Sequence, residues 1–325
     1  MAKIKTINVF PPAKDIEIGN YIDNDRPVFD PIDIVLVKNA YIGYYGYITK
    51  LFSNVEQIVS PRHRYTIGIK SILSNYFFKK KIKINQPAIS FVNGWYENFY
   101  HFSLECLVKL YILRDYSSNA TIVFPSHLSK FHKEWIEILD VKNIIYINEN
   151  QVIETPLAIS SNFPNRDLNH HHLILPEFKN WILSKVENKI GLSNDKIFIG
   201  RKFGSKRNLI NQNELATELK KLGYDYIEIE DYSVIEQINI FRNANRIIAV
   251  HGASLSHLTF CKPNTLVIDL IHEDYHVFCF LKLSKILNIN YNLLFCKGDK
   301  TEKSQAGYKN FSADINQIVN TVAKW

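Results

Sequence analysis

The sequence predicts an α/β protein of two domains, and three observations lead to this class. The chain has 325 residues, of which 46% are hydrophobic, enough apolar material for two packed cores. Charged residues make up 22%, close to the globular average, which argues against a largely disordered chain. From residue 88 onward, short runs rich in isoleucine and valine alternate with stretches of helical period, as in a sheet whose strands are joined by helices.

The N-terminal half has the less regular pattern. Residues 1–30 mix proline, aspartate and asparagine with short apolar stretches and predict an irregular lead-in. Residues 32–47 predict a β-hairpin or meander, interrupted at Asn39-Ala40, whose tyrosines form either a half-buried aromatic face or a platform for sugar stacking. Further predicted strands cover 89–92, 121–125 and 144–147, and predicted helices cover 96–111 and 128–139.

The C-terminal half alternates strand and helix more regularly. Predicted strands cover 196–200, 226–229, 246–250, 265–270 and 292–295, and predicted helices cover 178–190, 213–222, 234–242, 253–261, 278–287 and 312–323. This succession predicts a doubly wound sheet of Rossmann type that lacks the GxGxxG fingerprint. The pattern breaks between residues 160 and 180, so the predicted domains are 1–170, with the β-rich lead-in, and 171–325.

The chain is basic, with a formal net charge of +7 and a sequence pI near 9.0. A basic surface attracts nucleic acid, anionic headgroups or phosphorylated small molecules. Two basic runs stand out, over residues 79–83 and 201–207, without an arginine-rich tail or an RNA-binding aromatic motif. We therefore expect no nucleic acid partner. The first run predicts a solvated face, with a contact to a membrane surface as the alternative.

Cysteine usage and apolar runs bear on the expected location. The cysteines lie far apart, form no CxxC pair and predict reduced, buried thiols in a cytosolic protein. They are Cys106, Cys261, Cys279 and Cys296. The first residues lack the apolar core of a signal peptide, and no apolar run reaches the ~18 residues of a spanning helix. We expect a cytoplasmic protein, with peripheral contact at the inner membrane as an alternative.

Three features follow neighbouring strands of the second predicted sheet, where open α/β sheets bind ligands. The turn over residues 251–254 (His-Gly-Ala-Ser) ends one strand and opens a helix, so small residues and free amides can approach a phosphate. A basic segment beginning at Arg201 follows another strand and can set positive charge against a diphosphate. Asp269 lies at the end of a third strand, where a carboxylate can accept hydrogen bonds from ribose hydroxyls.

Each feature also has an ordinary structural explanation. The turn can simply join a strand to a helix, the basic segment can be a solvated loop, and Asp269 can cap a helix. Their common position at neighbouring strand ends is what favours a shared site. The run of histidines over residues 170–172 is a weaker candidate for metal binding, because adjacent histidines project in different directions and no carboxylate lies near them in sequence.

Three segments together resemble glycosyltransferase family 61. The longest is FRNANRIIAVHGASLS at 241–256, followed by PNTLVID at 263–269. The second is NFYHFSLE at 98–105, and the third is FIGR at 198–201 with SKRNLIN at 205–211. The resemblance covers roughly residues 32 to 270, with the segments in family order.

The resemblance implies a GT-B architecture, in which two Rossmann-like domains face a cleft and the C-terminal one holds the nucleotide-sugar. It also implies inverting transfer without an obligatory divalent metal or other cofactor. Two positions depart from the family pattern. Ser254 stands where the family usually has glycine, and Asp269 where it commonly has glutamate. Both departures suggest an unusual donor or a shifted nucleotide.

Inverting transfer requires a base for the acceptor hydroxyl and stabilisation of the leaving diphosphate. His101 and Glu105, four residues apart on one helix face, are the predicted catalytic pair, and either can be the base. A helix cap and a structural ion pair are the alternative interpretation. The predicted nucleoside-binding residue is Asp269. The predicted donor-phosphate residues are Arg201, Lys206, Arg207, His251, Gly252, Ala253 and Ser254.

Bacterial members of this family are often labelled capsular polysaccharide biosynthesis proteins, so the resemblance implies an inverting glycosyltransferase that builds a bacterial surface polysaccharide, capsule or lipopolysaccharide. Its expected partners are a nucleotide-sugar donor and a saccharide or lipid-linked acceptor. One alternative is a transferase that uses an acidic sugar or a polyol phosphate as the activated donor. The other is a non-catalytic nucleotide- or glycan-binding protein that keeps the same fold.

Overall fold

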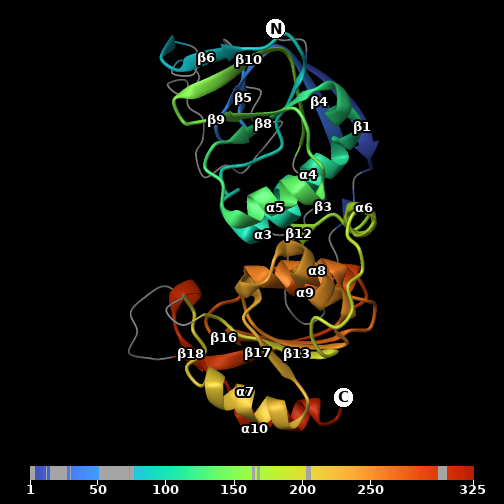
Figure 1. The fold of residues 1–325 in the computed structure, drawn as a ribbon, viewed down its shortest axis with the longest axis vertical. Coiled ribbons are helices and arrows are strands. Elements are labelled where there is room, and N and C mark those ends of the chain that lie inside the picture. Colours follow the sequence, from blue (N-terminus) through green and yellow to red (C-terminus); the bar gives the residue numbers. More distant parts are fainter. Residues whose placement is uncertain are drawn as a thin grey trace. The chain divides into compact units, whose positions relative to one another are not determined.

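The computed structural model describes residues 4–11, 13–14, 28–29, 31–50, 73, 77–162, 165–166, 169–202, 206–298 and 306–325. These residues form two compact units, the first ending at Lys185 and the second beginning at Val186 (Figure 1). The division follows helix α6 (Ile174–Leu183), whereas the sequence predicts it at residue 170. Helix α6 joins the first unit because the Tyr111 hydroxyl donates to Glu177 Oε2 at 2.7 Å and the buried Phe178 packs beside the Tyr111 ring.

The first unit is built on an eight-stranded mixed sheet among the described residues. Its strands are β1 (Ile4–Phe10), β4 (Ile32–Gly43), β5 (Ile48–Thr49), β6 (Lys80–Lys83), β7 (Ala88–Ile89), β8 (Thr121–Pro125), β9 (Ile144–Ile147) and β10 (Gln151–Ser161). They follow the order β1-β4-β10-β7-β8-β9, with β5 paired to β4 and β6 to β10. Strands β7 to β10 run parallel to their neighbours in this group, and β4 is antiparallel to β1 and β10.

Two short strand pairs lie outside this sheet. They are β2 (Ala13–Lys14) with β3 (Val28–Phe29), and β11 (Asn165–Arg166) with β12 (Asn169–His170). In the main sheet, several strands differ from the prediction. Strand β1 occupies part of the predicted irregular lead-in, so that expectation is wrong there. Strand β10 was not predicted, because Pro156 interrupts its apolar pattern. Strand β4 continues through the predicted break at Asn39, which adopts a φ of 52°, and pairs with β5 across a turn at residues 44–47. A hairpin is thus present, but its turn lies later in the chain than predicted.

A nearly continuous helix follows β7 in the first unit. It consists of α3 (Phe99–His101), the π-helix η1 (Phe102–Cys106) and α4 (Leu107–Ile112). Asn98 begins it, because its side-chain oxygen accepts a hydrogen bond from the Tyr100 N–H at 2.9 Å. The predicted helix over 96–111 is thus confirmed, with a π-helical stretch that a regular apolar stripe does not reveal. The remaining described helices are η2 (Arg114–Asn119), α5 (Lys130–Ile138) and α6.

The second unit contains a six-stranded sheet among its described residues. Its strands are β13 (Lys196–Ile199), β14 (Asp225–Ile227), β15 (Arg246–Val250), β16 (Leu266–His272), β17 (Asn290–Gly298) and β18 (Phe311–Ser312). The order is β14-β13-β15-β16-β17-β18, in which only β18 is antiparallel to its neighbour. All five predicted strands of this sheet are confirmed, and the two-residue β18 was not predicted. The predicted parallel α/β sheet is therefore observed in this unit.

Helices cover both faces of this second sheet (Figure 1). One face carries α7 (Gln212–Lys221) and α10 (Ile315–Val322), and the other carries α8 (Val234–Asn243), η4 (Ala253–Phe260) and α9 (Cys279–Ile286). Two short 3-10 helices, η3 (Ile229–Asp231) and η5 (Ala306–Tyr308), lie in loops. The α7 and α10 face buries an apolar core that includes Leu215, Leu219, Ile268 and Ile318. In the described part of the chain, no helix combines the length and apolarity needed to cross a membrane.

Candidate functional site

The strand order of the second unit creates a switch point between β13 and β15. The chain leaves β13 toward β14 on one side and later returns to β15 on the other side. At such a point the loops from the carboxyl ends of the two strands diverge, which is where doubly wound folds bind ligands. Arg201 closely follows β13 and His251 directly follows β15, so two predicted phosphate residues lie at this point.

The Arg201 side chain links the two strand ends. Its Nη1 donates a hydrogen bond to the main-chain oxygen of His251 at 2.8 Å. The Gln212 side chain fixes the Arg201 backbone, accepting from its N–H at 2.8 Å and donating to its oxygen at 2.9 Å. Burial, and next the charge of Arg207, lower the pKa of Arg201 to about 10, so the guanidinium is still charged at neutral pH. A largely buried cation therefore stands at the switch point.

Gly252 and the first residues of η4 form the predicted phosphate turn. A Cβ atom at residue 252 would lie 3.1 Å from Arg201 Nη1, so any side chain there would crowd the guanidinium. The Gly252 φ of −174° is extended, so this close approach, and not the backbone, requires glycine. The N–H groups of Ala253 and Ser254 begin the helix and have no acceptor within it. The turn can therefore offer amide donors to an anion.

His251, Asp269 and Tyr291 form a hydrogen-bonded network behind this turn. His251 Nδ1 lies 2.7 Å from Asp269 Oδ2, and the Tyr291 hydroxyl donates to the same oxygen at 2.5 Å. Asp269 has 0% exposure, which leaves the predicted ribose contact without an accessible carboxylate oxygen. Sequence reasoning missed Tyr291, which lies 22 residues beyond Asp269 in a strand without a motif.

The other two predicted cations lie over tyrosine rings. Arg207 Cζ is 5.2 Å from the centroid of the Tyr275 ring, and the edge of that ring meets the His251 ring at a centroid distance of 5.5 Å. Lys206 Nζ is 4.3 Å from the centroid of the Tyr308 ring. Arg207 also adopts a φ of 63°, a region that residues with side chains rarely populate. The structure thus brings Arg207, through Tyr275, to the same site as His251.

The predicted catalytic pair lies on the helix of the first unit. His101 Nδ1 is 2.9 Å from Glu105 Oε1, and Asn93 Nδ2 donates to Glu105 Oε2 at 2.7 Å. The Trp95 and His101 rings stack at a centroid distance of 5.4 Å. The His101 side chain is 21% exposed, against 6% for Glu105. The imidazole is therefore the accessible member of the pair, and the carboxylate contacts its inner nitrogen.

Lys109 is a buried cation one helical turn beyond Glu105. It is 1% exposed, and this burial lowers the pKa of Lys109 to about 8, although the charges of Cys106 and Glu105 oppose the shift. Sequence reasoning missed it, because lysines are almost never fully buried. The sequence feature that could have pointed to Lys109 is its position four residues after Glu105 within an otherwise apolar helical stretch.

The run of histidines over residues 170–172 has protein partners. His170 Nε2 lies 3.2 Å from the Tyr100 hydroxyl, and His171 Nε2 lies 3.3 Å from the main-chain oxygen of Pro11. Both rings are buried, at 2% exposure each. Burial lowers the pKa of His171, which favours a neutral ring. These contacts agree with a structural role for the two histidines.

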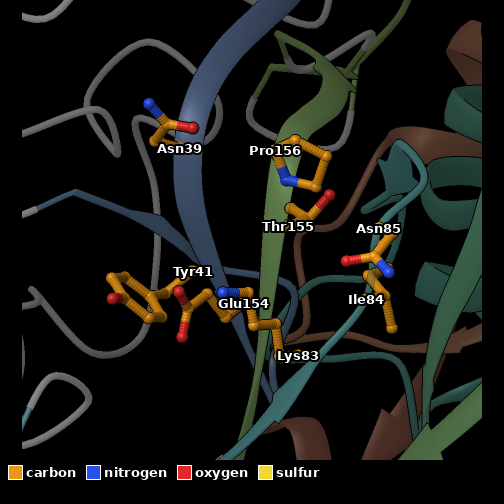
Figure 2. Close-up of a pocket in the computed structure, with 8 residues that line it drawn as sticks. All are labelled: Asn39, Tyr41, Lys83, Ile84, Asn85, Glu154, Thr155 and Pro156. Carbon is orange, nitrogen blue, oxygen red and sulfur yellow. The ribbon is translucent and has the colours of Figure 1, made fainter.

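A separate hollow of about 270 Å³ lies on the sheet of the first unit (Figure 2). It is lined by side chains of β4 and β10 and of the segment from Lys83 onward. Glu154 on β10 stands in register with Tyr41 on β4 and with Lys83 on β6, so these three side chains share one face. None of the residues that the sequence predicts for catalysis or donor binding lines this hollow.

A family model and several curated relatives match this chain. A sequence model described as Glycosyltransferase 61 matches residues 99–268, more than half of the chain, and this span contains His101, Glu105, Arg201 and His251. The EGF domain-specific O-linked N-acetylglucosamine transferases of Pan troglodytes and Gallus gallus are 30% and 29% identical over 132 residues. The enzyme of Drosophila melanogaster is 26% identical over 128 residues. Each match covers 36% of this chain and 24% of the relative, so the chain matches about a quarter of the length of these relatives.

Proposed function

Because this chain belongs to glycosyltransferase family 61, and so is a glycosyltransferase, we propose that it transfers a sugar with inversion from a nucleotide-activated donor. The observation that carries the proposal is the gathering of Arg201, Arg207 and His251 around the switch point of a doubly wound sheet. Free amides at the start of η4 lie at the same strand end. Cations, amide donors and a switch point together favour a diphosphate ligand.

In the proposed reaction, the two units supply different groups. His101 takes the proton of the acceptor hydroxyl, because it is the more exposed member of its pair and Glu105 orients its ring. The acceptor oxygen forms a bond to the anomeric carbon as the bond from that carbon to the diphosphate oxygen breaks. The electron pair of the broken bond stays on the diphosphate, where Arg201, Lys206, Arg207 and His251 counter the new charge.

We propose further that the two units adopt a GT-B arrangement, with the donor held by the second unit. Three side-chain cations and the η4 amides can counter the diphosphate charge, so we expect transfer without a bound divalent metal. The printed names of the relatives make N-acetylglucosamine the first donor sugar to test. Because Ser254 and Asp269 depart from the family pattern, the same test includes acidic-sugar and polyol-phosphate donors.

For the acceptor we propose a growing surface polysaccharide, capsule or lipopolysaccharide, on which the chain acts from the cytoplasmic side. The family resemblance supports this assignment, and the relatives modify EGF domains according to their names. A saccharide acceptor and a protein acceptor are therefore the two arms of the transfer assay. The rival proposal, a non-catalytic nucleotide- or glycan-binding protein, predicts donor binding with no turnover in either arm.

A thermal-shift panel tests the donor site directly. Its ligands are UDP-N-acetylglucosamine, UDP-glucose, GDP-mannose, CMP-sialic acid and CDP-ribitol. A ligand at about 100 times its Kd adds about 2.7 kcal/mol to the free energy of unfolding, so the preferred donor gives the largest shift. Arg201→Gln should remove most of this shift, whereas Lys220→Gln, which removes an exposed charge on α7, should keep it. If none of the five ligands stabilises the wild-type protein, the proposal fails.

A further inference from the structure

His251, Asp269 and Tyr291 come from three adjacent parallel strands and share one face of the sheet. Ala249 is in register with Asp269, and Val267 is in register with Tyr291. His251 lies two residues after Ala249, and Asp269 lies two residues after Val267, so the alternation of side chains puts all three on the same face. This is the face that α9 covers, since Phe280 of α9 packs against the His251 ring at a centroid distance of 5.3 Å.

The direction of the hydrogen bonds in this network follows from chemistry. Burial, and next the charge of Asp269, raise the pKa of Tyr291 far above its ordinary value, so the phenol keeps its proton and donates to Asp269 Oδ2. The other carboxylate oxygen, Oδ1, is buried and has no hydrogen-bond partner among the described residues. A carboxylate that already accepts from Tyr291 needs a second donor to offset its burial, and His251 Nδ1, at 2.7 Å, is the neighbouring group that can supply one.

We propose that Asp269 and Tyr291 are positioning residues that hold His251 with its proton on Nδ1 and present Nε2 to the departing diphosphate. The proposal rests on the diphosphate site of the proposed function, and it replaces the ribose contact predicted for Asp269. His251 Nε2 makes no hydrogen bond to any described residue, so this nitrogen remains for a ligand. The rings of Tyr275 and Phe280 contact the imidazole and limit its rotation.

The proposal gives each member of the network a distinct part. Phosphate oxygens only accept hydrogen bonds, so the ring takes up a second proton from solvent at Nε2 when the diphosphate binds, and this N–H donates to the diphosphate. The Asp269 carboxylate then stabilises the charged ring from its other side. Tyr291 fixes the carboxylate oxygen and has no contact of its own with the ligand. The effect of Tyr291 on the ligand must therefore pass through Asp269 and His251.

Nitrogen NMR of histidine-labelled protein measures the tautomer directly. The His251 signals are identified by their loss in His251→Gln. In wild-type protein without ligand we expect a protonated Nδ1 and an unprotonated Nε2, and in Asp269→Asn and Tyr291→Phe we expect a mixture of tautomers. Tyr224→Phe is the matched control, since it removes a buried hydroxyl of the same unit that has no hydrogen-bond partner among the described residues. An Nε2-protonated neutral ring in wild-type protein, or a tautomer unchanged in both variants, overturns the proposal.

Titration with inorganic pyrophosphate then distinguishes a positioning role of Asp269 and Tyr291 from a general contribution to the stability of the fold. We expect Asp269→Asn to weaken binding about ten- to hundredfold and Tyr291→Phe by a smaller factor. In the His251→Gln background, Tyr291→Phe should have no further effect, because Tyr291 acts on the ligand only through His251, which this background lacks. Additive losses in that double variant, with thermal unfolding unchanged, contradict the proposal. If wild-type protein shows the expected tautomer but binds no pyrophosphate, the donor site of the proposed function fails and the tautomer result still supports the positioning roles.

Discussion

Each unit of this family 61 chain contains a histidine whose Nδ1 contacts a carboxylate, and the two pairs are built in opposite ways. The His101 and Glu105 pair is local, formed within one helix at a spacing of four residues, and its imidazole is 21% exposed. The His251 and Asp269 pair joins two strands, and its side chains are only 5% and 0% exposed. The open pair suits exchange of a proton with a substrate, whereas the buried pair suits a fixed charge and direction.

The two pairs also differ in the third group that lies beside each carboxylate. Glu105 receives a hydrogen bond from Asn93 and has the buried cation Lys109 one turn away, so its environment contains a group that can lose its charge. Asp269 receives a hydrogen bond from Tyr291, which keeps its proton. In the proposed reaction, the same two functional groups therefore act as a proton acceptor or as a rigid donor, according to their exposure and to their third partner.

The largest expected effect is on turnover when the open pair is broken. His101→Gln removes the proposed base and should lower kcat by about 10²- to 10⁴-fold, the usual contribution of a general base. The affinity for the donor nucleotide should stay the same, because His101 lies outside the proposed donor site. Initial rates with the preferred donor measure kcat, and His127→Gln, at an exposed histidine of the same unit, is the control. Full activity in His101→Gln would refute its role as the base.

The next effect concerns the pH dependence of stability near the open pair. The pKa of Lys109 is about 8 in the folded chain and about 10.5 in the unfolded chain, so between these pH values the unfolded chain binds more protons. The contribution of Lys109 to the free energy of unfolding therefore rises with pH across this window, by on the order of 3 kcal/mol.

Lys109→Met should remove this rise, whereas Lys133→Met, at an exposed lysine of α5, should leave it intact. Urea unfolding at a series of pH values between about 7 and 10.5 measures the difference between each variant and the wild-type protein. A parallel pH dependence of wild type and Lys109→Met would show that Lys109 keeps an ordinary pKa in the folded chain.

A smaller effect tests how closely the Arg201 guanidinium packs against Gly252. Gly252→Ala places a Cβ atom 3.1 Å from Arg201 Nη1 and should displace the guanidinium, weakening pyrophosphate binding about three- to tenfold, a fraction of a charged hydrogen bond. The Arg201→Gln background provides the internal control, because alanine at residue 252 should cost nothing more once the guanidinium is absent. Calorimetric titration measures both, and an equal loss in the two backgrounds would contradict displacement of Arg201 as the cause.

The smallest effect concerns the ring that lies against His101. Trp95→Phe keeps an aromatic side chain but shortens the stack, and an aromatic contact contributes about 0.5–1.5 kcal/mol. We expect a two- to tenfold lower kcat without a change in donor affinity. Trp181→Phe, in the same unit but outside the site, is the matched control. A loss of donor affinity in Trp95→Phe would place Trp95 in donor binding instead.

Local features of these two regions can be predicted from the sequence, whereas features that depend on long-range contacts cannot. Helical spacing alone puts His101 beside Glu105, so their contact can be predicted without a fold. Alternating apolar runs also predict all five parallel strands of the second sheet and hence the strand ends that carry Arg201 and His251. Both predictions depend on patterns among residues that lie close together in the sequence.

Features that depend on long-range register could not be predicted. Tyr291 reaches Asp269 only because β17 pairs with β16 in one particular register, which no local pattern specifies. The same register buries Asp269 and removes the predicted ribose contact. In the first unit, Pro156 interrupts the apolar pattern of the central strand β10, so this strand could not be predicted. The π-helical turn at Glu105 does not alter the apolar pattern, so it could not be predicted either.

The proposed roles of His101 and His251 differ in whether the residue contacts the donor, and one measurement distinguishes these roles. Calorimetric titration compares wild type, His101→Gln and His251→Gln, using whichever nucleotide-sugar stabilises the wild-type protein most in the thermal-shift panel. We predict that His101→Gln binds with wild-type affinity and that His251→Gln binds at least about tenfold more weakly, because in the proposed site His251, and not His101, contacts the donor diphosphate. Equal affinity in all three proteins, or a loss confined to His101→Gln, would contradict the account.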